Sequence, residues 1–135
     1  DDEELTAWVN TMDLPIEVIR KYDDYVNHRT RFDTHQGVKG LEFDRVMVII
    51  DDSEAKGFMF SYDKLFGVKD LSDTDKKNRI DGKETSVERT QRLFYVTCTR
   101  AKNSLAVVMY TDNPQEVKNE SIHKGWFDEK EIIIM

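Results

Sequence analysis

Two stretches of the sequence carry side chains that suit sugar and phosphate ligands: residues 34–43 (THQGVKGLEF) and residues 88–101 (ERTQRLFYVTCTRA). A carboxylate such as that of Glu42 accepts hydrogen bonds from two hydroxyls at once, and such contacts hold a sugar without reading a base sequence. A guanidinium such as that of Arg100 is always charged, is planar and can bond phosphate oxygens in pairs. Both stretches are therefore candidates for a nucleotide or nucleic-acid site.

An α/β fold, with a mostly parallel sheet flanked by helices, is predicted to position these side chains. Residues 45–50 and 104–110 are apolar runs with little alternation, which is typical of strands buried on both faces of a parallel sheet. Residues 30–34 predict a further short strand that leads into a turn at Gly37 and Gly40. Ligands collect outside the carboxyl ends of parallel strands, so we expect the first stretch to lie at such an end.

The second stretch is predicted to form a helix from residue 86 to about residue 102, because residues 85–88 (TSVE) are a capping-box pattern. A helical wheel places one set of side chains toward the sheet: Val87, Gln91, Phe94, Tyr95, Cys98 and Ala101. A second stripe faces the other way: Arg89, Leu93, Val96 and Arg100. A helix that is apolar on two faces has a partner on each, so the second stripe could face another domain.

The rest of the chain predicts three more helices and one more strand. The helices are expected at about 3–10, from about Pro15, and from 113–114 to about 122, and the strand at 132–135. Residues 51–85 are interpreted as an insertion, whose polar part at 72–84 is predicted to be a mobile surface excursion. Its apolar neighbours are too many to leave in water: Phe58, Met59, Phe60, Tyr62, Leu65 and Phe66.

Size and composition predict a single globular domain, 1–135, because 135 residues suffice for one hydrophobic core but not for two large lobes. The net charge of −7 argues against a broad basic surface, so any nucleic-acid contact must be local. No apolar run approaches the roughly 20 residues that span a bilayer. With a single cysteine, Cys98, and no secretory signal, a cytoplasmic location without membrane contact is expected.

The two stretches resemble, in the right order, the fifth and sixth motifs of UvrD/Rep-type superfamily 1 DNA helicases. These motifs lie in the second of that family's two RecA-like motor domains. The direct matches in the first motif are Thr34, Lys39, Gly40, Leu41, Glu42 and Phe43. One departure is Gln36, which stands where the family usually has histidine, while His35 lies one position early. The resemblance covers about residues 34–110 and implies the carboxy-terminal portion of a second motor lobe.

The resemblance implies a nucleotide site that includes Gly40, Glu42 and Arg100. Glu42 would hydrogen-bond the ribose hydroxyls of ATP. Arg100 would reach across the cleft between the lobes to the terminal phosphate and act as the catalytic arginine finger. Such an arginine makes hydrolysis depend on closure of the lobes, and thereby couples it to movement along a DNA strand. The family often has a second arginine at the position of Gln91, so no phosphate contact is assigned there.

The resemblance also implies contacts to single-stranded DNA. Thr34, with His35 or Gln36, would contact the phosphates or sugars of the strand. Lys39 would either meet a phosphate or brace the loop, and the sequence does not separate these roles.

The sequence contains no Gly-x-x-x-x-Gly-Lys-Ser/Thr phosphate loop, so the residues that hold a triphosphate and its magnesium ion are absent from it. The chain is therefore expected to be inactive alone and to act with an amino-terminal phosphate-loop lobe, ATP and Mg²⁺. A nuclease or a DNA-repair protein would be a further partner. Two alternatives stay open: a helicase-like lobe that serves as an interaction or regulatory module, and the motor part of a helicase-nuclease.

Simpler structural readings exist for the main candidates. Glu42 could face water beside a plain turn, and Arg100 could be a cation at the carboxyl end of its helix. The acidic pairs Asp51-Asp52 and Asp73/Asp75 lack a third ligand at a suitable spacing, so no metal site is predicted. Cys98 is expected to be an inert core thiol.

Overall fold

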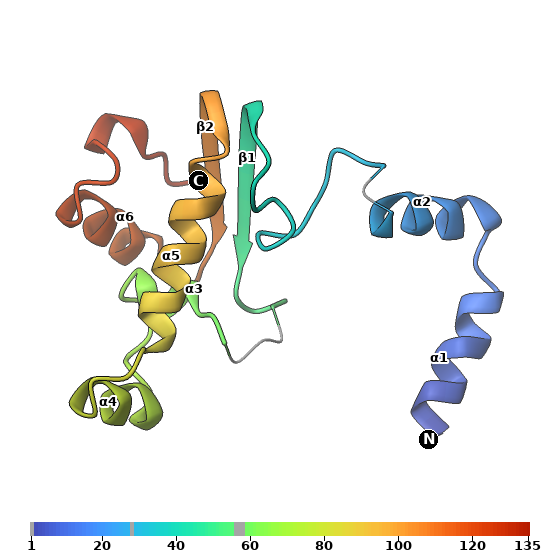
Figure 1. The fold of residues 1–135 in the computed structure, drawn as a ribbon, viewed down its shortest axis with the longest axis horizontal. Helices are drawn as coiled ribbons and strands as arrows, with labels where there is room; N and C mark the ends of the chain where they lie inside the picture. The colour runs from blue at the N-terminus through green and yellow to red at the C-terminus, as the bar shows by residue number, and fades with distance from the viewer. Residues whose placement is uncertain (1, 28, 56–58) are drawn as a thin grey trace. The chain divides into compact units, whose positions relative to one another are not determined.

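The computed structural model of the protein describes residues 2–27, 29–55 and 59–135. The chain forms two compact units, Asp1–Gly37 and Val38–Met135 (Figure 1). The boundary falls inside the first motif. Residues 34–37 therefore belong to the first unit, whereas residues 38–43 belong to the second.

The first unit consists of two amphipathic helices, α1 (Asp2–Met12) and α2 (Ile16–Val26), as predicted. Their apolar side chains remain exposed, including Trp8 at 63% and Met12 at 82%. The predicted strand at 30–34 is wrong, because these residues form a bend and irregular chain. The Thr30 hydroxyl accepts from the Phe32 amide at 3.2 Å, and this local turn competes with an extended conformation.

The second unit contains a parallel two-stranded sheet with helices beside it, which confirms the α/β class. Its elements, in chain order, are β1 (Phe43–Asp51), α3 (Tyr62–Leu65), α4 (Asp73–Ile80), α5 (Ser86–Cys98), β2 (Ala101–Tyr110), α6 (Pro114–His123) and a 3₁₀ turn, η1 (Glu129–Glu131). In the regular part of the sheet, Val46 pairs with Leu105 and Asp51 pairs with Tyr110. The two strands therefore start at one edge and run in the same direction (Figure 1).

The core of this unit lies between β1, α3 and α5. It consists of Val48, Ile50, Tyr62, Leu65, Phe66 and Phe94. Phe66 and Phe94 meet edge to face, with ring centroids 5.6 Å apart, and Trp126 packs against both rings. On β1 the alternate residues Met47 and Ile49 are 65% and 51% exposed, so among the described residues of this unit one face of the strand is buried and the other is exposed. The expectation of burial on both faces is therefore wrong here.

Helix α5 begins at the predicted capping box: the Thr85 hydroxyl accepts from the Glu88 amide, and the Glu88 carboxylate accepts from the Thr85 amide at 2.7 Å. It ends at Cys98, four residues earlier than predicted, because β2 begins at Ala101. The predicted core face is rotated from the observed one. The buried residues are Ser86, Thr90, Phe94 and Thr97.

Two residues predicted to face the sheet, Gln91 and Tyr95, are instead exposed. The buried hydroxyls on the observed face return hydrogen bonds to their own helix. Thr90 Oγ1 donates to the Ser86 carbonyl at 2.7 Å, and Thr97 Oγ1 donates to the Leu93 carbonyl at 2.8 Å. The hydroxyls of these buried threonines therefore have hydrogen-bond acceptors within their own helix, which a count of apolar residues does not anticipate.

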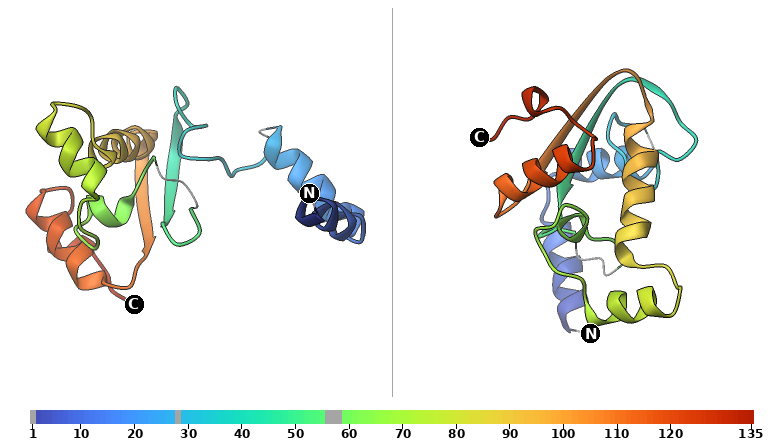
Figure 2. Two further views of the ribbon diagram at one scale, coloured as in Figure 1. Left: turned by 90° about the horizontal axis from the view of Figure 1, so that it is seen from below. Right: turned by 90° about the vertical axis from the view of Figure 1, so that its left-hand side faces the viewer.

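The polar stretch at 72–84 contains helix α4 rather than irregular chain. Ser72 caps the helix, and the buried Asp75 anchors it. The Asp75 carboxylate accepts hydrogen bonds from Lys64 Nζ at 2.7 Å, Ser72 Oγ at 2.6 Å and the Ser86 amide at 2.7 Å. This network ties α4 to α3 and to the first turn of α5. Figure 2 shows α4 beside the start of α5. The mobility assigned to the stretch stays a prediction.

The apolar neighbours of this stretch divide into two groups. Tyr62, Leu65 and Phe66 are buried, as expected, whereas Met59 is 49% exposed. Phe58 lies outside the described residues.

The predicted terminal strand at 132–135 is wrong, because the chain there has no regular structure and Ile133 is 80% exposed. An apolar run forms a strand only where a neighbouring strand offers backbone partners.

Candidate functional site

The two motifs meet at the edge where β1 and β2 begin. The Phe43 amide donates to the Arg100 carbonyl at 2.8 Å, and Arg100 Nη1 donates to the Leu41 carbonyl at 3.1 Å. We call this edge, formed by residues 39–43 and 99–103, the rim. It lies at the amino ends of the strands, so the expectation of a carboxyl end is wrong. Because residues 30–34 form no strand, the turn of the first motif precedes β1 instead of ending an earlier strand.

The Arg100 side chain is held in place by three acceptors. Nε donates to the Val96 carbonyl at 2.9 Å, Nη1 to Leu41, and Nη2 to Thr99 Oγ1 at 3.2 Å. A guanidinium has five N–H groups, so these bonds leave two of them for another ligand. Among the residues that the structure describes, no ion pair links Arg100 to an acidic side chain. The positive charge at the rim is therefore fixed in position and not neutralised locally.

The bond from Arg100 to Val96 agrees with the simpler alternative, in which Arg100 is a cation at the carboxyl end of its helix, because Val96 lies in the last turn of α5. A cation at this place stabilises the helix end. That role uses Nε alone and leaves both Nη atoms at the rim. The helix-capping and ligand-binding readings are therefore compatible.

Glu42 lies at the same rim with its carboxylate exposed. Its Oε2 is 3.0 Å from Lys102 Nζ. The hydrogen bond and charge of Lys102 lower the pKa of Glu42, and the charge of Arg100 contributes a smaller effect in the same direction. Glu42 is therefore ionised at neutral pH and can accept hydrogen bonds from hydroxyl groups.

The turn before β1 depends on Gly40, whose φ is +84°. Side chains at other residues disfavour this left-handed conformation. A Cβ at Gly40 would meet nothing within 4 Å, so the backbone angle and not the available space requires glycine. Lys39, next to it, is exposed, and the Leu41 amide donates to the Val38 carbonyl at 3.1 Å to close the turn.

The other predicted DNA-contacting residues, Thr34, His35 and Gln36, belong to the first unit. Thr34 Oγ1 accepts from the Gly37 amide at 2.9 Å, so its hydroxyl has a local structural role. Gln36 is exposed and His35 is half-buried. The structure brings Glu42 and Arg100 together within one unit, and these three residues belong to the other unit.

The acidic pairs considered for metal binding have structural partners. Asp51 Oδ1 accepts from Ser53 Oγ at 2.6 Å, and Asp52 Oδ2 accepts from the Asp63 amide at 2.9 Å. Within the described ranges, no group of three or more His, Cys, Asp or Glu side chains could hold a metal ion. Burial raises the pKa of the Cys98 thiol to about 11, which keeps it protonated at neutral pH.

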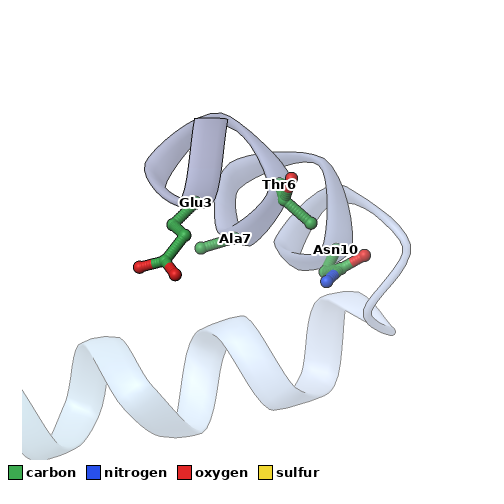
Figure 3. A pocket seen from close by; sticks show the side chains of 4 residues that line it. All are labelled: Glu3, Thr6, Ala7 and Asn10. Carbon is green, nitrogen blue, oxygen red and sulfur yellow. The ribbon is translucent and has the colours of Figure 1, made fainter. Parts of the chain in front are cut away.

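Each unit has a surface hollow. One is a shallow depression on α1 lined by Glu3, Thr6, Ala7 and Asn10 (Figure 3). Another lies between the end of α4 and the outer face of α5 and includes Arg92 and Tyr95. Neither contains Glu42 or Arg100.

Sequence reasoning missed two members of the rim, Lys102 and the Leu41 carbonyl. Lys102 was assigned to the end of a helix, where its side chain would have had no defined partner. Its contact with Glu42 depends on the pairing of β1 with β2, which joins residues far apart in the sequence.

In the comparison with protein families, residues 19–112 match the UvrD-like helicase C-terminal domain. This range is well over half of the chain and includes both motifs. The chain belongs to the family of UvrD-like helicase C-terminal domains. The predicted resemblance is thereby confirmed, and the family range extends beyond the predicted 34–110 into helix α2.

A search of curated proteins and a search of solved structures gave no significant match. The assignment of the chain to the UvrD-like family therefore rests on the family match and agrees with the α/β fold of the second unit. Among its described residues, no helix is long and apolar enough to cross a membrane.

Proposed function

We propose that this UvrD-like domain is the carboxy-terminal part of the second motor lobe of an ATP-dependent DNA helicase or translocase. The observation that carries the proposal is the contact between the two motifs at the rim, where Arg100 Nη1 bonds the Leu41 carbonyl beside Glu42. A fixed guanidinium and an ionised carboxylate on one edge suit the two ends of a nucleoside triphosphate, its phosphates and its sugar.

The residues at the rim fit the proposed ATP. When bound, ATP supplies the phosphoryl group whose transfer releases free energy. Arg100 donates its two remaining N–H groups to oxygens of the terminal phosphate, where negative charge grows during transfer. Glu42 accepts hydrogen bonds from the sugar hydroxyls and orients the nucleotide. The magnesium ion and the other phosphate contacts belong to a phosphate loop, which this sequence lacks, so the isolated chain neither binds ATP tightly nor hydrolyses it.

The anchoring of Arg100 explains how ATP hydrolysis would depend on closure of the two lobes. Three hydrogen bonds hold the guanidinium on the end of α5 and on the turn before β1. The side chain therefore follows the second lobe as a rigid body, and it reaches phosphate held by the first lobe only when the two lobes are closed. Hydrolysis that depends on closure couples ATP turnover to stepwise movement on single-stranded DNA. Thr34, His35, Gln36 and Lys39 are the proposed DNA contacts.

The test joins this chain to its native amino-terminal region and measures DNA-stimulated ATP hydrolysis. Arg100→Ala is expected to lower kcat by ~10³-fold or more, with little change in ATP affinity, because the arginine acts on the transition state. Arg92→Ala is the matched control. Arg92 lies on the same helix but pairs with Glu84, so its loss should leave kcat within about twofold. Full activity of Arg100→Ala would overturn the proposal.

A second candidate function is a protein-interaction module without motor activity. The exposed apolar residues of α1 and α2 favour it, because such surfaces often contact another protein. The departure at Gln36 from the usual histidine also fits a lobe that has lost DNA contact. The upstream reading frame separates the two candidates: a phosphate loop there supports the motor, and its absence supports the interaction module.

A further inference from the structure

Lys102 is the residue that holds the Glu42 carboxylate. Its Nζ lies 3.0 Å from Glu42 Oε2, and both side chains are about half exposed, at 54% and 61%. Within the described part of the chain, Glu42 has no other ion pair or hydrogen bond through its side chain. Lys102 therefore engages one carboxylate oxygen and leaves the other oxygen open to a ligand.

An irregularity in the sheet aims Lys102 at this place. Phe43 pairs with Ala101, but the next pair joins Arg45 to Ser104, so β2 has one residue more than β1 between these pairs. A bulge of this kind re-aims a side chain, and bulges are common beside functional sites. The extra residue allows Lys102 to reach Glu42 while its neighbour Asn103 reaches Asp44 at 3.3 Å.

The ion pair between Lys102 and Glu42 affects where the Glu42 carboxylate lies relative to Arg100. Arg100 and Lys102 are two cations that act on the Glu42 carboxylate. Without Lys102, the carboxylate is free to rotate toward the uncompensated Arg100 guanidinium and engage the N–H groups that the proposed phosphate contact needs. Lys102 thus keeps the sugar-binding and phosphate-binding groups apart.

We propose that Lys102 is a positioning residue for nucleotide-sugar recognition, which holds Glu42 on the β2 side of the rim with one oxygen directed at the sugar hydroxyls. The inference rests on the proposed nucleotide site. It adds a residue that touches neither the phosphate nor the sugar and acts only through Glu42.

The experiment compares ATP with 2′,3′-dideoxy-ATP in the protein that carries both this chain and its phosphate-loop lobe. The ratio of the two KM values reports recognition of the sugar hydroxyls. Glu42→Gln should reduce the preference for ATP. Lys102→Ala should reduce it by about two- to fivefold, the range expected from an exposed ion pair. Lys102→Arg, which retains the charge, should keep most of the preference.

Asn103→Ala is the matched control, because it removes the neighbouring contact across the strands without touching Glu42. It should leave the ratio unchanged. If Glu42→Gln lowers the preference and Lys102→Ala does not, the inference about Lys102 is wrong while the proposed nucleotide site stands. If Glu42→Gln has no effect either, the sugar-binding role of Glu42 fails. Full activity of Arg100→Ala would show separately that the proposed motor function fails.

Discussion

Arg100 and Leu41 are 59 positions apart in the sequence, yet the Arg100 guanidinium donates to the Leu41 carbonyl at 3.1 Å. The Phe43 amide returns a bond to the Arg100 carbonyl at 2.8 Å, so each motif supports the other through its backbone. The candidate phosphate ligand is thereby fixed beside the candidate sugar ligand. A change in the position of Arg100 must therefore alter the position of Glu42, and the reverse.

Replacement of Arg100 by lysine tests whether the planar guanidinium matters beyond its charge. A single ammonium cannot bond Val96, Leu41 and Thr99 from one fixed plane and still offer paired N–H groups to a phosphate. We expect Arg100→Lys to lose at least ~10²-fold in DNA-stimulated ATPase rate, close to the loss in Arg100→Ala. Single-turnover ATP hydrolysis by the protein with both lobes measures this rate.

The control for that change is Arg79→Lys on the exposed surface of α4. Arg79 lies away from the rim, so its conservative replacement should leave the ATPase rate unchanged. An Arg100→Lys protein that retained the full rate would mean that positive charge alone suffices at the rim. In that case the hydrogen bond to Leu41 would have no role in positioning.

Local sequence signals placed the elements that carry the rim, but not the direction in which their side chains point. The capping box at Thr85 and Glu88 gave the start of α5, and the apolar runs gave both strands. Residues 30–34 and 132–135 were also expected to be strands and form none, because strand formation requires a neighbour that local sequence does not specify. The bulge that aims Lys102 at Glu42 depends on the register of two distant strands and has no local signal.

The adjacent aromatics Phe94 and Tyr95 test the observed face of α5. Both were predicted to pack on the sheet, but Phe94 is 5% exposed and Tyr95 is 68% exposed. Phe94→Ala removes a ring that contacts Tyr62, Phe66 and Trp126, so we expect a loss of roughly 3–5 kcal/mol in unfolding free energy. Tyr95→Ala should change it by less than about 0.5 kcal/mol. Urea unfolding of both variants measures the difference, and equal losses would contradict the observed face.

The buried Asp75 should make the stability of the chain sensitive to acid. Burial raises the pKa of Asp75, but hydrogen bonds from Lys64, Ser72 and Ser86 outweigh it, and the net pKa lies well below the ordinary 3.8. A carboxylate with a lowered folded pKa stabilises the fold above the unfolded pKa and loses that contribution as the pH falls below it. We therefore expect unfolding free energy to fall as the pH decreases from about 5 to about 2.

Asp75→Asn should remove much of this acid sensitivity and cost roughly 2–4 kcal/mol at neutral pH, because the amide leaves the half-buried Lys64 ammonium without its anion. Asp73→Asn is the control, since the Asp73 side chain is fully exposed and its contact with Lys76 is 3.6 Å long. Urea unfolding at several pH values compares the three proteins. If the unfolding free energy of Asp75→Asn falls with decreasing pH as much as that of the wild type, a group other than Asp75 causes the acid sensitivity.

Thr90 links α5 to the segment before α3, and its replacement by the isosteric valine tests that link. The fully buried Thr90 Oγ1 accepts from the Ser61 amide at 2.9 Å and donates to the Ser86 carbonyl at 2.7 Å. Thr90→Val leaves the Ser61 amide without its acceptor, so we expect a loss of about 1–3 kcal/mol in unfolding free energy. Thr11→Val removes a similar helix bond on the exposed α1 and should cost less than about 0.5 kcal/mol. Equal losses would mean that the bond to Ser61 does not hold α3 against α5.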